Sequence, residues 1–223
     1  MVSALSPPKK LKNINFTIKE DNMSTKYSCT VKNDSTQAGD FCIFQEVPDV
    51  NIPNIVTLAW LAKAANPTTT LKFDWSLDYN FIWSNTTNLQ PGTQVDASQS
   101  WPCDTTTRNR INLEKVNNAY TFDDITQGDY RGNLYIDQGP SVESNKVSVG
   151  IGMSGKGTFL APSQPNMQLC FTPKPTYWLA FGTFVEGEVV DIAQVTKNAF
   201  KLDYKGVTDL SVTLEANNTF SLS

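Results

Sequence analysis

The sequence contains no histidine. Catalytic triads and Cys–His pairs use an imidazole as their base, and histidine is also the commonest protein ligand of transition metals. Lysine and carboxylate chemistry remain open to such a chain, but the most frequent catalytic base is missing. We therefore expect a protein that is not an enzyme and that holds no cofactor and no metal.

Closely spaced cysteines and long apolar runs are also lacking. The cysteines stand at 29, 42, 103 and 170, without the CxxC spacing that is typical of zinc sites. The first residues contain prolines and lysines where a signal peptide needs an unbroken apolar core. No stretch approaches the about 20 apolar residues of a membrane helix. We expect a cytoplasmic protein with reduced thiols and no membrane partner.

The chain also lacks a strong excess of charge of either sign. The chain has 18 Lys and Arg against 22 Asp and Glu, a formal net charge of −4, which disfavours nucleic acid as a partner. At 223 residues with 39% hydrophobic residues, it can bury a sizeable core without disulfides or metals. No proline- or glycine-rich linker divides it. We expect a flexible N-terminal tail over residues 1–24 and one β-sandwich domain over 25–223.

What the sequence does have is a long alternating run from residue 71 to 83. Its odd positions are all large and apolar, whereas its even positions are polar except for Ile82. A period of two is typical of a β-strand, because successive side chains leave the backbone on opposite faces. We expect 70–84 to form a strand that bends or splits in two. Its predicted core residues are Phe73, Trp75, Leu77, Tyr79, Phe81 and Trp83.

Other strand-like segments follow at short intervals, separated by Asn, Asp, Pro and Gly clusters that favour turns. A polar region from about 92 to 128 shows little strand pattern, and 189–200 is the one candidate for a short helix. The pattern predicts an all-β fold, a single antiparallel β-sandwich of many short strands. The expected strands are 27–32, 41–45, 56–62, 133–137, 146–152, 158–161, 167–172, 177–184, 200–204 and 210–214, with apolar residues following at 220 and 222.

The glycine-rich segment 150–158, GIGMSGKGT, resembles a phosphate-binding loop in which Lys156 would reach the phosphates. Such a loop must open a helix, whose N-terminal amides hold the anion. Here Pro162 and Pro165 follow closely and stop a helix. We predict instead a hairpin that pairs 146–153 with 158–161, which explains the glycines without a nucleotide.

Carboxylates form two further groups. Paired carboxylates can hydrolyse a glycosidic bond or bind calcium, but the spacing here matches a calcium loop only loosely. We expect solvated loops at both places. The two groups are Asp123, Asp124 and Asp129, and Glu186, Glu188 and Asp191.

Aromatic residues in polar loop regions are the candidates for a binding site. Trp101 and Tyr130, with the neighbouring Arg131, could stack on a sugar face or anchor a partner. Equally, Trp101 could close the end of the sandwich, and the sequence leaves both interpretations open. The run 71–83 is also long enough for a strand of a pore-forming toxin, but no equally long partner strand appears.

Several short segments carry a resemblance to a known family. They are 41–45 (FCIFQ), 58–60 (LAW), 66–70 (NPTTT), 73–75 (FDW), 79–83 (YNFIW) and 175–178 (PTYW). They resemble the RhiA-like family, whose namesake is an abundant bacterial protein expressed in the rhizosphere. The resemblance spans residues 25–205, and abundant proteins of fungal fruiting bodies look related to a lesser extent. It implies a soluble, strongly expressed protein without an assigned biochemical role. No functional residue can be carried over from it.

The leading hypothesis is therefore a non-enzymatic, abundantly expressed protein that acts by self-association, as a homo-oligomer, in a storage or structural role. The alternative is a module that binds a glycan or another small ligand through Trp101, Tyr130 and Arg131. A membrane-active toxin is the third hypothesis.

Overall fold

The computed structural model describes residues 24–47 and 52–223. The tail expected over 1–24 therefore lies almost wholly outside the described residues. Within them nearly all regular structure is β, so the all-β prediction is confirmed. The elements are β1 (Lys26–Asn33), β2 (Gly39–Gln45), β3 (Val56–Thr57), β4 (Leu61–Ala65), β5 (Thr70–Ser76), β6 (Tyr79–Ser84), β7 (Gln99–Cys103), β8 (Arg110–Val116), β9 (Ala119–Thr126), β10 (Leu134–Gln138), β11 (Ser148–Met153), β12 (Lys156–Pro162), β13 (Gln168–Phe171), β14 (Tyr177–Gly182), α1 (Ile192–Val195), β15 (Phe200–Leu202), β16 (Asp209–Leu214) and β17 (Phe220–Leu222).

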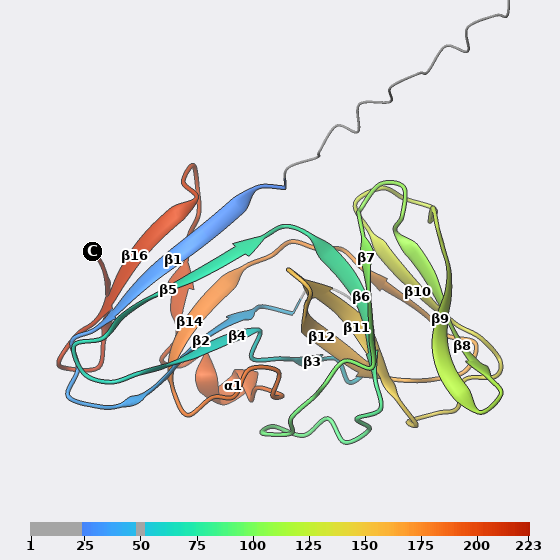
Figure 1. Cartoon of the computed structure of the whole chain (residues 1–223), viewed down its shortest axis with the longest axis horizontal. Helices are drawn as coiled ribbons and strands as arrows, with labels where there is room; N and C mark the ends of the chain where they lie inside the picture. Colours follow the sequence, from blue (N-terminus) through green and yellow to red (C-terminus); the bar gives the residue numbers. More distant parts are fainter. Residues whose placement is uncertain (1–23, 48–51) are drawn as a thin grey trace, which may run out of the picture.

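The strands form four sheets that pack in two pairs (Figure 1). Sheet A has the order β17-β16-β1-β5 and packs on sheet B, β15-β14-β2-β4; we call this pair the first sandwich. Sheet C, β3-β12-β11-β6-β7, packs on sheet D, β13-β10-β8-β9, as the second sandwich. Most neighbouring strands run antiparallel, while β1 and β16, and β8 and β10, run parallel.

The alternating run 71–83 supplies both sandwiches. Its first part, β5, buries Phe73 and Trp75 in the core of the first sandwich, whereas β6 buries Phe81 and Trp83 in the core of the second. Leu77 and Tyr79 lie at the bend between these strands and are only partly buried. The predicted split of the run is therefore confirmed, and one stretch of sequence connects two separate cores.

The structure explains why Ile82, an apolar residue, stands at an even position of the alternating run. It is 2% exposed on the outer face of sheet C, where loop residues cover the sheet and β6 is buried on both faces. A strand buried on both faces reads as apolar on both. The residues that share this outer cluster are Leu58, Val95, Leu160 and Val189.

The glycine-rich segment forms a hairpin, as predicted. β11 and β12 pair antiparallel, and their turn is Ser154 and Gly155, whose φ angles of 52° and 76° are those of a two-residue hairpin turn. The segment 189–200, the one candidate for a short helix, contains the four-residue α1, where the side chain of Asp191 accepts a hydrogen bond from the backbone N–H of Gln194.

The polar region 92–128 contains more structure than its sequence indicated. It carries β7 and the hairpin β8–β9, in which Ile111 and Leu113 are fully buried. The hairpin turns at Asn117 and Asn118, with φ angles of 50° and 65°. The face of β8 opposite to Ile111 and Leu113 carries Asn112 and Glu114, and this short alternation is the strand signal that the polar composition obscured.

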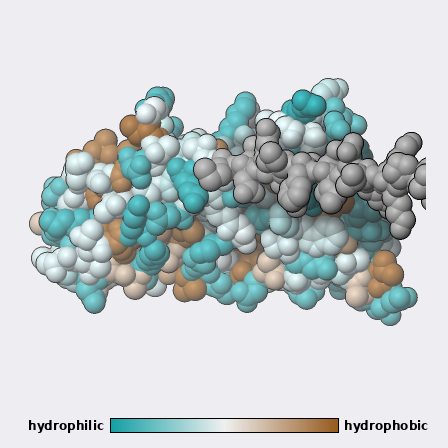
Figure 2. All heavy atoms as spheres, turned by 45° about the horizontal axis from the view of Figure 1, so that its top comes forward, coloured by the Kyte–Doolittle hydropathy of each residue, from teal (hydrophilic) through white to brown (hydrophobic). Residues whose placement is uncertain are grey.

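On the face shown in Figure 2, apolar residues lie in small groups among hydrophilic ones rather than in one extended patch. Among the residues that the structure describes, no helix has the length and apolar character needed to cross a membrane.

Candidate functional site

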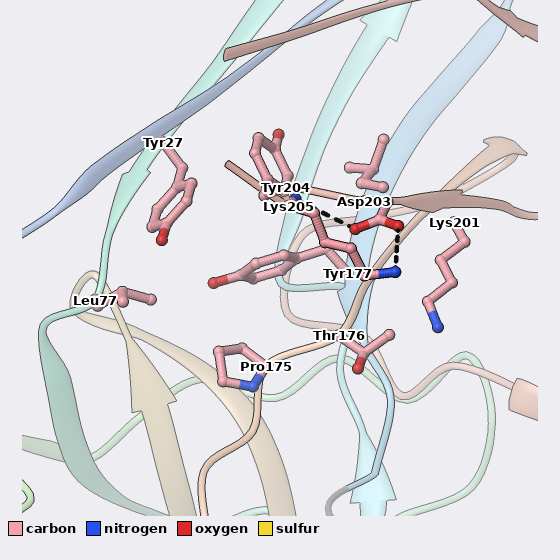
Figure 3. A pocket seen from close by; sticks show the side chains of 10 residues that line it. Tyr27, Leu77, Pro175, Thr176, Tyr177, Lys201, Asp203, Tyr204 and Lys205 are labelled. Carbon is pink, nitrogen blue, oxygen red and sulfur yellow. Dashed lines mark hydrogen bonds and ion pairs between the residues drawn. The ribbon is translucent and has the colours of Figure 1, made fainter. Parts of the chain in front are cut away.

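A cavity of about 340 Å³ opens at the end of the first sandwich, beside the bend that leads to the second (Figure 3). We call it the tyrosine pocket, because three tyrosine side chains from separate strands and loops form its walls. Its lining residues are Tyr27, Leu77, Pro175, Thr176, Tyr177, Lys201, Leu202, Asp203, Tyr204 and Lys205.

Strand pairing places the tyrosines. Tyr27 lies near the start of β1, opposite Trp75 of β5, while Tyr177 begins β14, opposite Leu202 of β15. Tyr204 lies two residues after the end of β15. Residues opposite each other in an antiparallel pair project from the same face of the sheet, and these pairs lie at the sandwich end. The last inward-facing positions of the strands therefore become the wall of a pocket.

The aromatic rings hold one another in fixed orientations. The ring centroids of Tyr27 and Tyr204 are 5.1 Å apart and edge-to-face, and those of Tyr177 and Tyr204 are 5.9 Å apart. Behind them, Trp75 packs 5.1 Å from Tyr177 and Trp60 stacks on it at 5.9 Å. Each such pair contributes about 0.5–1.5 kcal/mol beyond its buried area. The walls of the pocket are therefore preformed.

Hydrogen bonds fix part of this cluster further. The Tyr204 hydroxyl donates to the carbonyl of Ser28 at 2.8 Å, and the Trp60 indole N–H donates to the carbonyl of Met153 at 2.9 Å. Burial raises the pKa of both Tyr177 and Tyr204, so both stay neutral at physiological pH. Neutral phenols can donate and accept hydrogen bonds without bringing charge into the pocket.

The free space lies between aromatic and apolar side chains. Figure 3 shows Tyr27, Leu77, Pro175 and Tyr177 around it, with the hydroxyls of Tyr27 and Tyr177 directed toward it. The charged residues lie along one side, where the carboxylate of Asp203 accepts from Lys205 Nζ at 3.0 Å. The arrangement can stack a flat ring and hydrogen-bond its edge.

The predicted site residues lie elsewhere. Trp101 is part of β7, opposite Phe81, and its ring packs 6.3 Å from that of Phe122 against the second core. Tyr130 is 71% exposed and Arg131 is exposed in the loop between β9 and β10. None of the three predicted residues lines the tyrosine pocket.

The loop that carries Tyr130 and Arg131 contacts the loop that follows β7, the strand of Trp101. The backbone N–H of Gly132 donates to the carbonyl of Thr105 at 2.7 Å, which joins the loop of Tyr130 to the loop after β7. The half-buried position of Trp101 agrees with the interpretation that this residue closes the end of the sandwich. Its role, like those of Tyr130 and Arg131, stays a prediction.

The carboxylate groups are dispersed. Glu186 binds Lys156 Nζ at 2.7 Å, and Asp129 lies 3.7 Å from the guanidinium of Arg110. Within residues 24–47 and 52–223, no three His, Cys, Asp or Glu side chains are grouped so that they could hold a metal ion.

The tyrosine pocket was missed at the sequence level. Tyr27 and Tyr177 open expected strands, but the alternation of a strand does not show which other strands will meet at its end. The PTYW segment, which contains Pro175 and Tyr177, carries the family resemblance, but nothing in its sequence indicates a binding site.

The comparisons with known proteins agree with that resemblance. A family model described as RhiA matches residues 24–223. Protein RhiA of Rhizobium leguminosarum bv. viciae is 35% identical over 205 residues, which cover 89% of this chain and 87% of that protein. No solved structure matches the chain.

Proposed function

The chain belongs to the RhiA family, and because that name states neither a ligand nor a reaction, we propose from the chain's own geometry that it binds a small ring-shaped ligand in the tyrosine pocket. The observation that carries the proposal is the set of tyrosine rings, held in place by Trp60 and Trp75 around a cavity of about 340 Å³. That volume falls in the usual range of ligand sites, about 300–1,000 Å³.

The chemistry of the walls supports this function. The face of a tyrosine ring packs well against the apolar face of a sugar or against another aromatic ring. The hydroxyl of Tyr27 is available to the polar edge of such a ligand, whereas the hydroxyl of Tyr177 donates to Met153 Sδ at 3.9 Å. Because the rings are already ordered, a ligand does not have to immobilise them, and less free energy is lost on binding. The proposal is of binding and includes no chemical step.

A comparison of Tyr27→Ala with Trp101→Ala shows whether a ligand binds in the tyrosine pocket or at the site predicted around Trp101, Tyr130 and Arg131. Sugars, sugar acids and small aromatic alcohols and acids are titrated while tryptophan fluorescence is recorded, since Trp75 contacts both Tyr27 and Tyr177. We expect Tyr27→Ala to weaken binding at least tenfold, because it removes one wall of the pocket. Trp101→Ala should bind as the wild type does.

Thermal unfolding of both variants shows whether each remains folded, and Tyr27→Phe keeps the ring if Tyr27→Ala does not fold. Loss of binding in Trp101→Ala with no loss in the Tyr27 variants would place the site at the predicted loops. Absence of binding by the wild type across the panel would overturn the proposal.

A second proposal is self-association in a storage or structural role. It is supported by β17, the edge strand of sheet A, which pairs with β16 on one side and carries Leu222 at 64% exposure. An open edge with an exposed apolar side chain is suited to pairing with a second copy. For both functions we propose a cytoplasmic location, in keeping with the four free thiols.

A further inference from the structure

The second sandwich has one sheet edge that lies open beside an apolar groove. β13 is an edge strand of sheet D and, within residues 24–47 and 52–223, pairs only with β10. The groove beside it has a volume of about 310 Å³ and is lined by Ile52, Pro53, Met167, Gln168, Leu169 and Cys170. Native proteins usually cover such an edge with a further segment, because its free backbone groups pair readily with another strand.

The hydrogen bonds between β13 and β10 show which backbone groups of β13 are free. The Gln138 N–H donates to the carbonyl of Met167 at 2.9 Å. Hydrogen-bonded positions alternate along an antiparallel pair, so Leu169 also directs its backbone groups toward β10. The backbone N–H and C=O groups of Gln168 and Cys170 therefore face the open edge.

A strand pattern stands in the sequence that precedes the described residues. Residues 13–19 read NINFTIK, with apolar residues at 14, 16 and 18 and polar residues between them. This is the period of two that predicts a strand with one apolar face. Isoleucine, phenylalanine and threonine are also among the residues enriched in strands. The segment therefore has the alternation needed to cover an apolar groove on one side and face solvent on the other.

The open edge lies within reach of this segment. The carbonyl of Thr25 accepts from the Leu77 N–H at 3.3 Å, and Leu77 lines the tyrosine pocket together with Pro175. Pro175 stands four residues after the end of β13, a length of chain that spans at most about 14 Å. Seven residues lead from Ile18 to Thr25, and when extended they span up to about 25 Å. The connection is therefore long enough to pass the pocket and meet the end of β13.

We propose that residues 13–19 add to sheet D as a further strand beside β13 and parallel to it. The direction follows from the connection, because the end of the segment that leads to β1 meets the end of β13. Sheet D already contains a parallel pair, β8 and β10. Leu169 packs into the second core, so the register that matches apolar with apolar residues places Phe16 beside Leu169 and Thr17 beside Cys170. The inference does not depend on a ligand in the tyrosine pocket.

Disulfide formation tests both the register and the occupant of the groove. In Thr17→Cys, the added thiol and Cys170 would lie on neighbouring strands about 5 Å apart, a Cα separation that a disulfide can bridge. Mild oxidation of the full chain should convert at least half of this variant to a form with an internal 17–170 disulfide, identified by peptide mass mapping. Ser3→Cys, outside the alternating segment, is the matched control and should give less than a tenth of the corresponding product.

Amide hydrogen exchange, measured by NMR, tests the docking without a cross-link. The N–H groups of Gln168 and Cys170 should exchange at least tenfold more slowly in the wild type than in Phe16→Lys, because a charge directed into the groove would remove the added strand. Asn15→Lys places the same charge on the solvent side of the segment and should keep the wild-type rates. Thermal unfolding shows whether both variants stay folded.

The outcomes decide the proposal. Equal exchange rates in the wild type and Phe16→Lys would overturn it, and so would equal disulfide yields in Thr17→Cys and Ser3→Cys. A 17–170 disulfide that joins two chains, seen as a doubled mass on a non-reducing gel, would assign the groove to a second copy and overturn docking within one chain. If Phe16→Lys does not fold, the disulfide yields decide alone.

Discussion

At the residue scale, Asp104 shows how one carboxylate orders a loop. It follows β7, and its Oδ1 accepts hydrogen bonds from the backbone N–H groups of Thr106 at 2.6 Å, Thr107 at 2.6 Å and Arg108 at 3.3 Å. Partial desolvation opposes the ionisation of Asp104, but these donors outweigh it and hold its pKa below the ordinary value. The loop after β7 depends on this charge.

We therefore expect Asp104→Ala to lower the free energy of unfolding by about 1 kcal/mol at pH 7, the usual cost of losing a side chain that caps backbone N–H groups. Because the folded pKa is depressed, the stabilisation is present above the ordinary carboxyl pKa of 3.8 and is lost as the pH falls toward the folded value. Urea unfolding at neutral and acid pH measures both effects.

The control for this loop is Asp123→Ala, which removes an exposed carboxylate from β9. Its stability should stay close to that of the wild type. A difference between Asp104→Ala and the wild type that stays constant down to pH 2 would contradict the electrostatic explanation.

At the element scale, the tip of the β11–β12 hairpin joins the two sandwiches. Ser154 Oγ donates to the carbonyl of Ser76 at 2.9 Å and accepts from its backbone N–H at 2.8 Å, while the Ser154 N–H donates to the carbonyl of Asp78 at 2.8 Å. The hairpin belongs to sheet C, whereas Ser76 ends β5 of sheet A. One serine thus ties the hairpin to the bend in the run 71–83.

Removal of this hydroxyl leaves two backbone groups without their partner. We expect Ser154→Ala to lower the free energy of unfolding by about 1–2 kcal/mol, since each net hydrogen bond contributes about 1 kcal/mol. The exposed Ser144, in the loop before β11, provides the control as Ser144→Ala. Equal stability of both variants, measured by urea unfolding, would show that the hairpin tip does not hold the bend.

The same elements show what the sequence could and could not predict. Alternation in 71–83 identified a strand, its buried face and a bend, because these depend on local periodicity. It did not show that Phe73 and Phe81 would enter different cores, since that depends on which strands pair with β5 and β6. The tyrosine pocket was hidden for the same reason: Tyr27 and Tyr204 meet only through pairings between distant segments.

At the scale of the whole molecule, four of the eight sheet edges contact the edge of a neighbouring sheet, β4 with β5 and β7 with β9. The side chain of Lys63 on β4 donates to the carbonyl of Lys72 on β5, and Gln99 of β7 accepts from the backbone N–H of Phe122 on β9. Sheets A and B thus meet along one side, and sheets C and D along another. Edges that contact a neighbouring sheet are poor templates for pairing with a second chain.

Strand β17 is the edge at which assembly would be favoured. Phe220 packs inward, 5.9 Å from the ring of Phe200, while Leu222 projects into solvent at 64% exposure. If self-association uses this edge, light scattering on a size-exclusion column, over a hundredfold range of concentration, should give a defined multiple of 24.7 kDa. Leu222→Lys should return the mass to that of one chain, because a charge on an edge strand opposes pairing.

The matched control for assembly is Val207→Lys, which adds the same charge at an exposed apolar residue outside every strand. It should keep the wild-type mass. A wild type that stays at 24.7 kDa throughout the concentration range would contradict self-association as the function. A multimer that survives Leu222→Lys would instead move the interface away from β17. Ligand titrations on the same samples would show whether binding in the tyrosine pocket depends on assembly. Because all residues that line the pocket belong to one chain, we expect binding to be independent of assembly.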